Sequence, residues 1–384
     1  MNCPVCHSKN TKPCLTLENS PIYQHPVPDP TIIPPPYTVD LYYQRCSDCS
    51  HVYQLGDNQR ILENIYSHHY YTPPASNIGT TFRDDFLHFI KQLPLTTQIT
   101  SSILEVGSSS GEMLAALKNV FSVNNAVGFE PNIDAAKEAR DKGLNIYTEF
   151  FTVNAIESFN KTFDLIYSRH VIEHIFDFED FFKATNLISS NKTQLIIETP
   201  SLDWGIENNS TIAFHIEHIH VFSEFSLVKL AKLYGWYKKS STVTSAGNLI
   251  TAFTKYSNDT EQPSLPNNMA DMQKNNEMIF KYINTITKQK KTILWGAGTC
   301  GISLISSAKI KPVNIVDGNA DKAGKFYCGF DKAVEFAPTV IKKLVKNNQD
   351  RDMLIIISSS FYQEIKANLH ELGWRGEIYV PDIF

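Results

Sequence analysis

The chain lacks long apolar segments and dense clusters of basic residues. Its 384 positions contain no apolar run of about eighteen residues, so we expect no membrane span. Lys and Arg number 35 against 40 Asp and Glu, and no basic cluster predicts a nucleic-acid interface. The first ten residues lack the basic-then-apolar order of a signal peptide. We therefore predict a cytoplasmic protein of two or three domains that binds neither membranes nor nucleic acid.

Cysteine is scarce, but four of the seven cysteines form two C-x-x-C pairs. Two such pairs joined by a loop can present four thiolates in the tetrahedron that Zn²⁺ prefers, whereas the alternative is a set of reduced thiols. A redox role is disfavoured because neither pair opens a helix in a βαβ pattern. The Pro-rich segment 26–36 between the pairs is expected to run as an extended excursion. We predict a structural zinc ion with the ligands Cys3, Cys6, Cys46 and Cys49.

Short apolar runs alternate with amphipathic stretches from residue 102 onward, which predicts a mostly parallel sheet with helices on both faces. Strands are expected at 102–107, 126–130, 163–168, 194–200 and 248–255, and then at 291–296, 312–317, 353–359 and 376–381. The predicted fold class is α/β, with a second, Rossmann-like unit behind the first. The expected boundaries are 1–60 for the zinc module, 61–255 for the central domain, 256–290 for a linker and helix, and 291–384 for the C-terminal domain.

The segment ILEVGSSSGEML predicts a nucleotide-binding turn. A buried strand ends at Glu105, small residues from Gly107 to Gly111 form a turn, and a helix follows at once. Such a turn lets the backbone approach a ligand and points helix N–H groups at it. Glu130 ends the next strand, where a carboxylate can accept hydrogen bonds from ribose hydroxyls. The same layout serves NAD, and an ordinary tight turn is the plainer alternative.

Three motifs in this order resemble those of class I S-adenosylmethionine methyltransferases: ILEVGSSSG, GFEPN and FDLIYSRHVIEHI. The resemblance implies a Rossmann-like methyltransferase sheet and S-adenosylmethionine as the cofactor. The methionine part would lie near the first strand and its turn, the ribose on the acid of the second strand, and the loop after the fourth strand beside the cofactor. The implied cofactor-binding residues are Glu105, Gly107, Ser109, Gly111, Glu130 and His170. Ser109 replaces the middle glycine of the family's usual motif.

A four-cysteine module, a methyltransferase and a Rossmann-like tail together resemble the sugar C-methyltransferases that act on nucleotide-linked keto sugars. In that family a Glu-His pair in a loop after the fifth strand lies at the active site, and the matching residues are Glu217 and His218. Methylation beside a carbonyl requires removal of an α-proton, for which a histidine with an adjacent acid is suited. The family also places a tyrosine near the sugar, with Tyr70 for substrate binding and Tyr71 for catalysis as the candidates.

His215 and His220 lie in the same loop as His218 and are predicted to bind substrate. Because three histidines lie so close together, spacing alone does not identify the base. Partly exposed loop histidines without a catalytic role are the plainer alternative. Metal ligation by these histidines is a lesser alternative, because no second carboxylate motif accompanies them.

The C-terminal unit carries a complete G-x-G-x-x-G at Gly296, Gly298 and Gly301, and Asp317 ends the next strand. Read alone, this pattern predicts NAD. The unit is short, with about four strands, and the resemblance implies that Gly296 and Gly298 help to hold the nucleotide diphosphate of the substrate. A purely structural tail is an equal alternative.

The predicted function is methyl transfer to a nucleotide-linked keto sugar, at carbon and through an enolate. The nearest rival is O-methylation of a sugar or polysaccharide precursor. A non-catalytic nucleotide-binding protein and an NAD-linked enzyme are the rivals from other classes.

Overall fold

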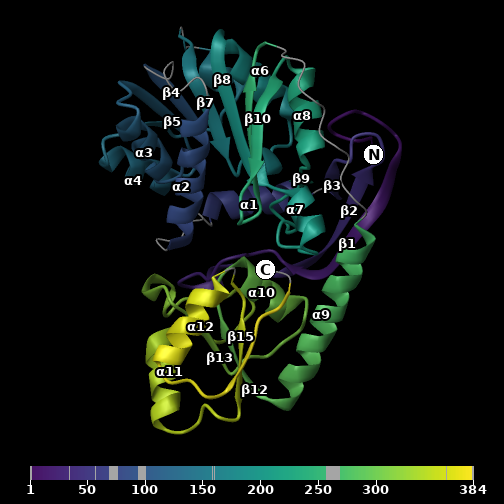
Figure 1. The fold of residues 1–384 in the computed structure, drawn as a ribbon, viewed down its shortest axis with the longest axis vertical. Coiled ribbons are helices and arrows are strands. Elements are labelled where there is room, and N and C mark those ends of the chain that lie inside the picture. Colours follow the sequence, from purple (N-terminus) through teal and green to yellow (C-terminus); the bar gives the residue numbers. More distant parts are fainter. Residues whose placement is uncertain are drawn as a thin grey trace.

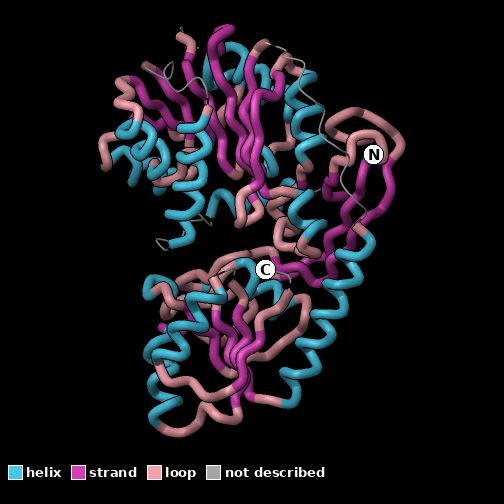
Figure 2. The backbone as a smooth tube through the Cα atoms, viewed as in Figure 1, coloured by secondary structure: helices cyan, strands magenta, loops and turns pink. Residues whose placement is uncertain are grey.

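The computed structural model divides the chain into an N-terminal sheet, a central α/β domain and a C-terminal α/β domain (Figures 1 and 2). It describes residues 2–33, 35–56, 58–68, 77–93, 101–157, 159, 161–256, 269–359 and 361–382. Each of the three parts has its own sheet in the described chain. No helix within these ranges is long and apolar enough to cross a membrane.

The N-terminal sheet has the order β1-β2-β3-β9, and its strands are antiparallel. The strands are β1 (Thr11–Pro21), β2 (Thr38–Cys46), β3 (Val52–Leu55) and β9 (His220–Val221). The Pro-rich segment between β1 and β2 includes a short 3-10 helix, η1 (Pro30–Ile32), and reaches the C-terminal domain, where Val27 forms a bridge with Phe326. Because β9 comes from the central domain, the N-terminal part is built into that domain.

The central sheet has seven strands in the order β10-β11-β8-β7-β4-β5-β6. The parallel strands are β4 (Ser102–Val106), β5 (Asn125–Phe129), β6 (Asn145–Tyr147), β7 (Phe163–Arg169) and β8 (Ser189–Pro200). The antiparallel strands are β10 (Tyr237–Val243) and β11 (Asn248–Thr254). The five strands predicted for this domain are confirmed. The two edge strands, β6 and β10, were not predicted, because one is short and the other is largely polar.

Helices cover both faces of this sheet, as predicted. Successive residues of β4 point to opposite faces: Ile103 packs with the cluster under α2, α3 and α4, and Leu104 packs with the cluster under α6 and α8. The helices are α1 (Gln59–His68), α2 (Asn77–Gln92), α3 (Glu112–Val120), α4 (Ile133–Asp141), α5 (Val153–Ile156), α6 (Phe178–Leu187), α7 (Leu202–Glu207) and α8 (Glu224–Leu233). One further turn of 3-10 helix, η3 (Ile172–His174), follows β7.

The C-terminal sheet is fully parallel, with the order β14-β13-β12-β15-β16. Its strands are β12 (Lys291–Trp295), β13 (Asn314–Asp317), β14 (Val334–Phe336), β15 (Met353–Ile357) and β16 (Glu377–Tyr379). The short strand β14 adds one to the predicted four. The helices are α9 (Ala270–Gln289), α10 (Thr299–Ser306), α11 (Ala337–Lys346) and α12 (Tyr362–Glu371), with a 3-10 turn η4 (Ala320–Lys322). The helix predicted in the linker region corresponds to α9.

The carboxyl ends of the two parallel sheets face each other across the molecule (Figure 1). The segment that follows β8 contacts the C-terminal domain, since the Thr211 hydroxyl donates to Asn276 of α9 over 2.9 Å. A small pocket at this junction is lined by residues of β1, of the 211–214 segment and of α10, among them Ser20, Phe214 and Thr299. Ligand sites of parallel α/β sheets lie at their carboxyl ends, so both domains turn that end toward a shared region.

Candidate active site

Residues in the left-handed backbone region build the turn after β4. Gly107 has a φ of 74°, Ser109 of 49° and Gly111 of 77°. A Cβ atom at Gly107 would lie 2.5 Å from Val171 Cγ2, and one at Gly111 would lie 2.3 Å from Leu144 Cδ1. Both positions therefore require glycine for conformation and for packing. Ser109 adopts the left-handed region in place of the family's glycine, so the serine does not interrupt the turn.

Glu130 joins this turn to the end of β5. Its Oε2 atom accepts a hydrogen bond from the Ser109 backbone N–H over 2.8 Å, and Oε1 accepts one from the Asn132 N–H over 2.9 Å. Burial raises the pKa of this carboxyl above its ordinary value, although the two backbone donors oppose the shift. Each carboxylate oxygen has a further lone pair, so Glu130 can still accept hydrogen bonds from two hydroxyl groups.

Two polar groups beside the turn are buried without a hydrogen-bond partner within the described residues, namely Oε2 of Glu105 and Oγ of Ser108. Burial raises the pKa of the Glu105 carboxyl to about 8, and the nearby Arg169 guanidinium opposes this shift. A buried polar atom without a partner costs about 1–3 kcal/mol, which a ligand donor would recover.

These groups fit S-adenosylmethionine by their chemistry. Its ammonium group is a donor suited to Glu105, and its ribose hydroxyls are donors suited to Glu130. Gly111 is the N-cap of α3 and makes no side-chain cap hydrogen bond, and helix N-termini of this kind are suited to bind ligand acceptors.

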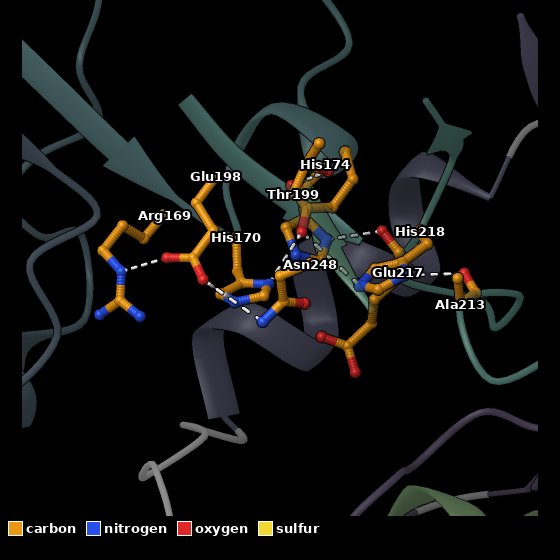
Figure 3. Close-up of polar contacts among 10 residues, drawn as sticks. Arg169, His170, His174, Glu198, Thr199, Ala213, Glu217, His218 and Asn248 are labelled. Atoms are coloured by element: carbon orange, nitrogen blue, oxygen red, sulfur yellow. Dashed lines mark hydrogen bonds and ion pairs between the residues drawn. The ribbon is translucent and has the colours of Figure 1, made fainter. Parts of the chain in front are cut away.

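Polar residues at the ends of β7 and β8 form a network (Figure 3). The Arg169 guanidinium makes an ion pair with the buried carboxylate of Glu198, which also accepts a hydrogen bond from Asn248 over 3.3 Å. His170 has a φ of 53°, and its backbone N–H donates to the Glu198 carbonyl over 2.9 Å. Burial lowers the pKa of the His170 imidazole, but the carboxylates of Glu173 and Glu198 outweigh it and raise the pKa overall.

The N-terminal sheet holds the loop that carries the predicted catalytic pair. The Tyr43 hydroxyl donates to the carbonyl oxygens of His215 over 3.0 Å and of His218 over 3.4 Å. The Gln54 amide donates to the Tyr43 hydroxyl over 3.1 Å and to the His215 carbonyl over 3.4 Å. The backbone of the loop is therefore fixed by side chains that lie more than a hundred residues away in sequence.

His220 connects the same two parts. Its Nε2 atom lies 3.1 Å from the Ile175 carbonyl oxygen, and its Nδ1 atom lies 3.0 Å from Nε2 of His51. Because both ring nitrogens contact protein groups and the ring is buried, the structure gives His220 a supporting position in the loop. Its predicted contact with substrate stays a prediction.

Glu217 and His218 are adjacent in sequence but point to different surroundings. His218 Nδ1 lies 2.8 Å from the Ala213 carbonyl oxygen, which can only accept, so Nδ1 carries a hydrogen. The His215 ring packs on the His218 ring, with centroids 3.7 Å apart. The Glu217 carboxylate points away from the other side chains drawn in Figure 3, and no described residue hydrogen-bonds to it. Burial raises its pKa, against the influence of His174.

The structure brings most of the predicted residues to one edge of the central sheet. The turn glycines, Glu130 and His170 lie at the carboxyl ends of β4, β5 and β7. Glu217 and His218 lie on the loop that crosses this edge, because the Glu217 carbonyl oxygen is 2.7 Å from Nδ1 of His174 in η3. Tyr70 and Tyr71 lie outside the described residues.

The predicted glycines of the C-terminal domain lie in a separate turn. Gly296 has a φ of 121°, and its Cβ would lie 2.7 Å from the Ser358 carbonyl oxygen, whereas a Cβ at Gly298 would meet nothing within 4 Å. The Tyr327 hydroxyl donates to the Gly298 carbonyl over 2.8 Å.

Four polar residues of the site were not singled out from the sequence, namely Glu173, His174, Glu198 and Asn248. Glu198 is an acidic residue at the end of a buried strand, which is the same signal that identified Glu130. Glu173 follows His170 by three residues in the motif FDLIYSRHVIEHI, and its burial was not visible in the sequence.

The four predicted zinc ligands lie together. The Sγ atoms of Cys3 and Cys49 are 3.5 Å apart, as are those of Cys6 and Cys46, and all four lie within 4.8 Å of one another. Zinc bound at about 2.3 Å to four thiolates places the sulfur atoms about 3.8 Å apart, so this donor set fits a zinc ion. The cluster packs into the core beneath α6 and α8.

Comparisons with known proteins give a family match to the central domain and several similar solved structures. A family model described as a methyltransferase domain matches residues 80–240. The structure is similar to an S-adenosylmethionine-dependent methyltransferase from Clostridium acetobutylicum at 12% identity, covering 45% of this chain and 89% of that one with a TM-score of 0.35. It is also similar to the N-methyltransferase NodS from Bradyrhizobium japonicum at 14% identity, covering 45% and 96% with a TM-score of 0.36.

A complex of DhpI with SAH is similar at 15% identity, covering 45% of this chain and 89% of that one with a TM-score of 0.33. No curated protein matches the sequence. The family match and the sheet edge that carries the motifs together lead to one conclusion: residues 80–240 of the chain contain a methyltransferase domain.

Proposed function

We propose that the chain methylates a nucleotide-linked keto sugar at the carbon beside the carbonyl group. The chain order supports this proposal, since a four-cysteine cluster, a methyltransferase domain and a second parallel α/β domain follow one another as in the sugar C-methyltransferases. The C-terminal domain would hold the nucleotide part, because its turn at Gly296–Gly301 faces the same region as the methyltransferase sheet edge.

The observation that carries the proposal is the environment of two adjacent side chains, Glu217 and His218, each of which can accept a proton. One presents a half-buried carboxylate with a raised pKa, and the other an imidazole whose Nδ1 hydrogen is fixed by Ala213. Either group would take the α-proton of the substrate, and desolvation makes the Glu217 carboxylate the stronger acceptor of the two. When bound, S-adenosylmethionine supplies the electrophilic methyl group. The loop positions the base through the contacts from Tyr43 and Gln54.

The test uses a panel of nucleotide-linked sugars, with and without a keto group, deuterated at the carbon beside the carbonyl. We expect methyl transfer to a keto sugar and loss of the α-deuterium to water. A Glu217→Gln or His218→Gln variant is expected to lose exchange and transfer together by a factor of about 100 or more, which is within the range of general-base catalysis. Glu207→Gln, an exposed acid nearby, serves as the control.

Methylated product that retains all of its α-deuterium would overturn the proposed carbon methylation. Methyl transfer to hydroxyl groups of sugars without a keto function would then establish the rival O-methyltransferase. Binding of the panel without any transfer would favour a nucleotide-binding protein.

We also propose that the four-cysteine cluster holds a structural zinc ion. Four thiolates complete a tetrahedral shell and leave no position for substrate. The ion would stabilise the sheet whose strand β3 pairs with β9, directly after the catalytic loop. A Cys49→Ser variant is expected to lose zinc, thermal stability and methyl transfer, measured by elemental analysis, calorimetry and turnover. A zinc-free variant with unchanged stability would contradict this role.

A further inference from the structure

Three side chains that can ligate a metal meet near the turn after β4, namely Glu173 and His174 from η3 and His218 from the catalytic loop. Figure 3 shows His174 and His218 beside each other. Each offers one ligand atom, and these atoms lie within 4.8 Å of one another. The sequence showed histidines in this loop without a second carboxylate motif. Glu173 supplies the missing carboxylate from a segment more than forty residues earlier in the chain.

The Glu173 carboxylate is fully buried and only partly satisfied. Its Oε2 atom accepts a hydrogen bond from the Thr199 hydroxyl over 3.1 Å. Its Oε1 atom has no hydrogen-bond partner in the described part of the chain. Nδ1 of His170 lies 3.5 Å from this oxygen, and Nε2 of His218 lies 4.0 Å from it. A buried anionic oxygen is therefore directed into the space between the imidazoles, where a cation would be the natural partner.

Backbone hydrogen bonds fix the two histidine ligands in a suitable tautomer. Nδ1 of His174 lies 2.7 Å from the Glu217 carbonyl oxygen, and Nδ1 of His218 lies 2.8 Å from the Ala213 carbonyl oxygen. Since a carbonyl oxygen only accepts, Nδ1 carries the hydrogen in both rings, and in the neutral ring Nε2 carries the lone pair. Metal-binding histidines commonly donate their second nitrogen to a backbone carbonyl in this way.

The His218 lone pair and the Glu173 oxygen thus face each other as two acceptors, 4.0 Å apart. Two acceptors that face each other in a buried site require a proton or a cation between them. Ligand atoms bound to one cation at about 2.1 Å lie roughly 3.0–3.4 Å apart, so shifts of less than about one ångström in each side chain close the site.

We propose that Glu173, His174 and His218 bind one divalent transition-metal cation at the active site. One carboxylate and two imidazoles suit Zn²⁺, Mn²⁺, Fe²⁺ or Co²⁺. Three protein ligands leave coordination positions open, and these positions accept oxygen atoms of the substrate. The site is separate from the four-cysteine cluster, whose ligands are the sulfur atoms of Cys3, Cys6, Cys46 and Cys49.

A consequence, which rests on the proposed function, is the identity of the base. If His218 binds a cation, its Nε2 lone pair is engaged, and the proton acceptor is the Glu217 carboxylate. The cation draws electrons from the substrate oxygen and so makes the adjacent C–H or O–H more acidic. The proton moves to Glu217, the new bond to the methyl group forms as the carbon–sulfur bond breaks, and S-adenosylhomocysteine leaves.

Manganese binding tests the site without any substrate. The 384-residue chain is treated with EDTA, and elemental analysis verifies that the cysteine-bound zinc remains. Mn²⁺ is then titrated while the electron paramagnetic resonance signal of free Mn²⁺ is recorded. Manganese is a poor competitor for thiolate ligands, so it reports on the nitrogen–oxygen site. We expect one bound Mn²⁺ per chain in addition to the zinc.

Glu173→Gln and His174→Gln are each expected to weaken this binding at least tenfold, whereas His88→Gln, an exposed histidine on α2, leaves it unchanged. Binding of S-adenosylmethionine by each variant verifies that it is folded. The proposal is overturned if the wild-type protein binds S-adenosylmethionine but shows no saturable Mn²⁺ or Zn²⁺ site, or if Glu173→Gln binds Mn²⁺ as the wild type does. The first of these outcomes leaves the proposed methyl transfer intact, with His218 again eligible as the base.

Discussion

The molecule contains two turns of similar design, one in each parallel α/β domain. In both, a strand ends in a glycine with positive φ, Gly107 after β4 and Gly296 after β12. In both, an acid at the end of the neighbouring strand accepts a hydrogen bond from a backbone N–H of the turn. Glu130 accepts from Ser109 over 2.8 Å, and Asp317 accepts from Ala297 over 2.7 Å.

The surroundings of the two turns differ. Asp317 also pairs with the ammonium group of Lys322 at 3.1 Å, and the Tyr327 hydroxyl covers the Gly298 carbonyl. The Asp317 carboxylate and the Gly298 carbonyl of the C-terminal turn therefore have hydrogen-bond or ion-pair partners within their own domain. The methyltransferase turn has buried polar atoms of Glu105 and Ser108 without partners in the described chain. The same motif thus has its polar groups paired within one domain, whereas in the other it leaves buried polar atoms without described partners, and the sequence pattern does not separate the two.

Of the substitutions that test this comparison, those of glycine are expected to have the largest effect, and they act on stability. A Cβ at Gly301 would lie 2.1 Å from the Gly296 carbonyl oxygen, a backbone atom that has little freedom to move. We expect Gly301→Ala to destabilise the C-terminal domain by about 3 kcal/mol. Gly298→Ala is expected to leave stability unchanged, because nothing lies within 4 Å of its Cβ position. Thermal unfolding measures both, and a strongly destabilised Gly298→Ala would show that the turn is tighter than described.

Replacing Glu130 and Asp317 one at a time shows which of the two turns binds which nucleotide. Glu130→Ala is expected to weaken S-adenosylmethionine binding by a factor of about 10–100, because a carboxylate that accepts ribose hydroxyls contributes roughly 1.5–3 kcal/mol. Asp317→Ala is expected to leave that affinity unchanged. Calorimetric titration with S-adenosylmethionine, S-adenosylhomocysteine and NAD measures both effects. Tight NAD binding that Asp317→Ala abolishes would reverse the comparison and make the C-terminal turn the nucleotide site.

The unsatisfied carboxyl of Glu105 predicts a dependence of stability on pH. Its pKa is about 8 in the folded protein against an ordinary value of 4.5. The folded state therefore favours the protonated form, and this contribution to stability is complete below pH 4.5 and lost as the pH rises through 8. We expect the midpoint temperature of the wild type to fall between pH 6 and pH 9 relative to that of Glu105→Gln.

The control for this experiment is Glu138→Gln, whose carboxylate is exposed and pairs with Lys142. It is expected to follow the wild-type profile in calorimetric scans. Parallel profiles for the wild type and Glu105→Gln would mean that the Glu105 carboxylate is already satisfied in the free protein.

Removal of the Tyr327 hydroxyl gives the smallest expected effect. Tyr327→Phe deletes one hydrogen bond to Gly298 and is expected to cost about 1 kcal/mol of stability, without any change in S-adenosylmethionine affinity. If this variant gains affinity for a nucleoside diphosphate, then the Tyr327 hydroxyl is the group that hinders nucleotide binding at the C-terminal turn.

Much of the fold could be predicted, because its signals are local. Apolar runs bounded by turns identified β4, β5, β7, β8 and β11, and the four main strands of the C-terminal sheet. The strands β6, β10 and β14 were missed, since they are short or polar and owe their pairing to a neighbouring strand. The doubled C-x-x-C spacing predicted that four cysteines would lie together, and they do.

The candidate site divides in the same way. The turn glycines were predicted from one strand–turn–helix pattern, and Glu130 was predicted from the end of the next strand. Both signals lie in neighbouring segments of the sequence. Glu173 was not identified, because its significance depends on burial and on the approach of His218, 45 residues later.

The sequence by itself determined the α/β class, the glycine turn after β4 and the cysteine cluster, since each depends on residues close together in the chain or on spacing repeated within it. The tertiary structure decided what surrounds them. It placed the N-terminal sheet against the 213–220 loop through His51 and His220, 169 residues apart. It also paired the polar groups beside one glycine turn and left buried polar atoms beside the other without described partners. Contacts between distant segments depend on packing and chain entropy over the whole fold, which local patterns do not encode.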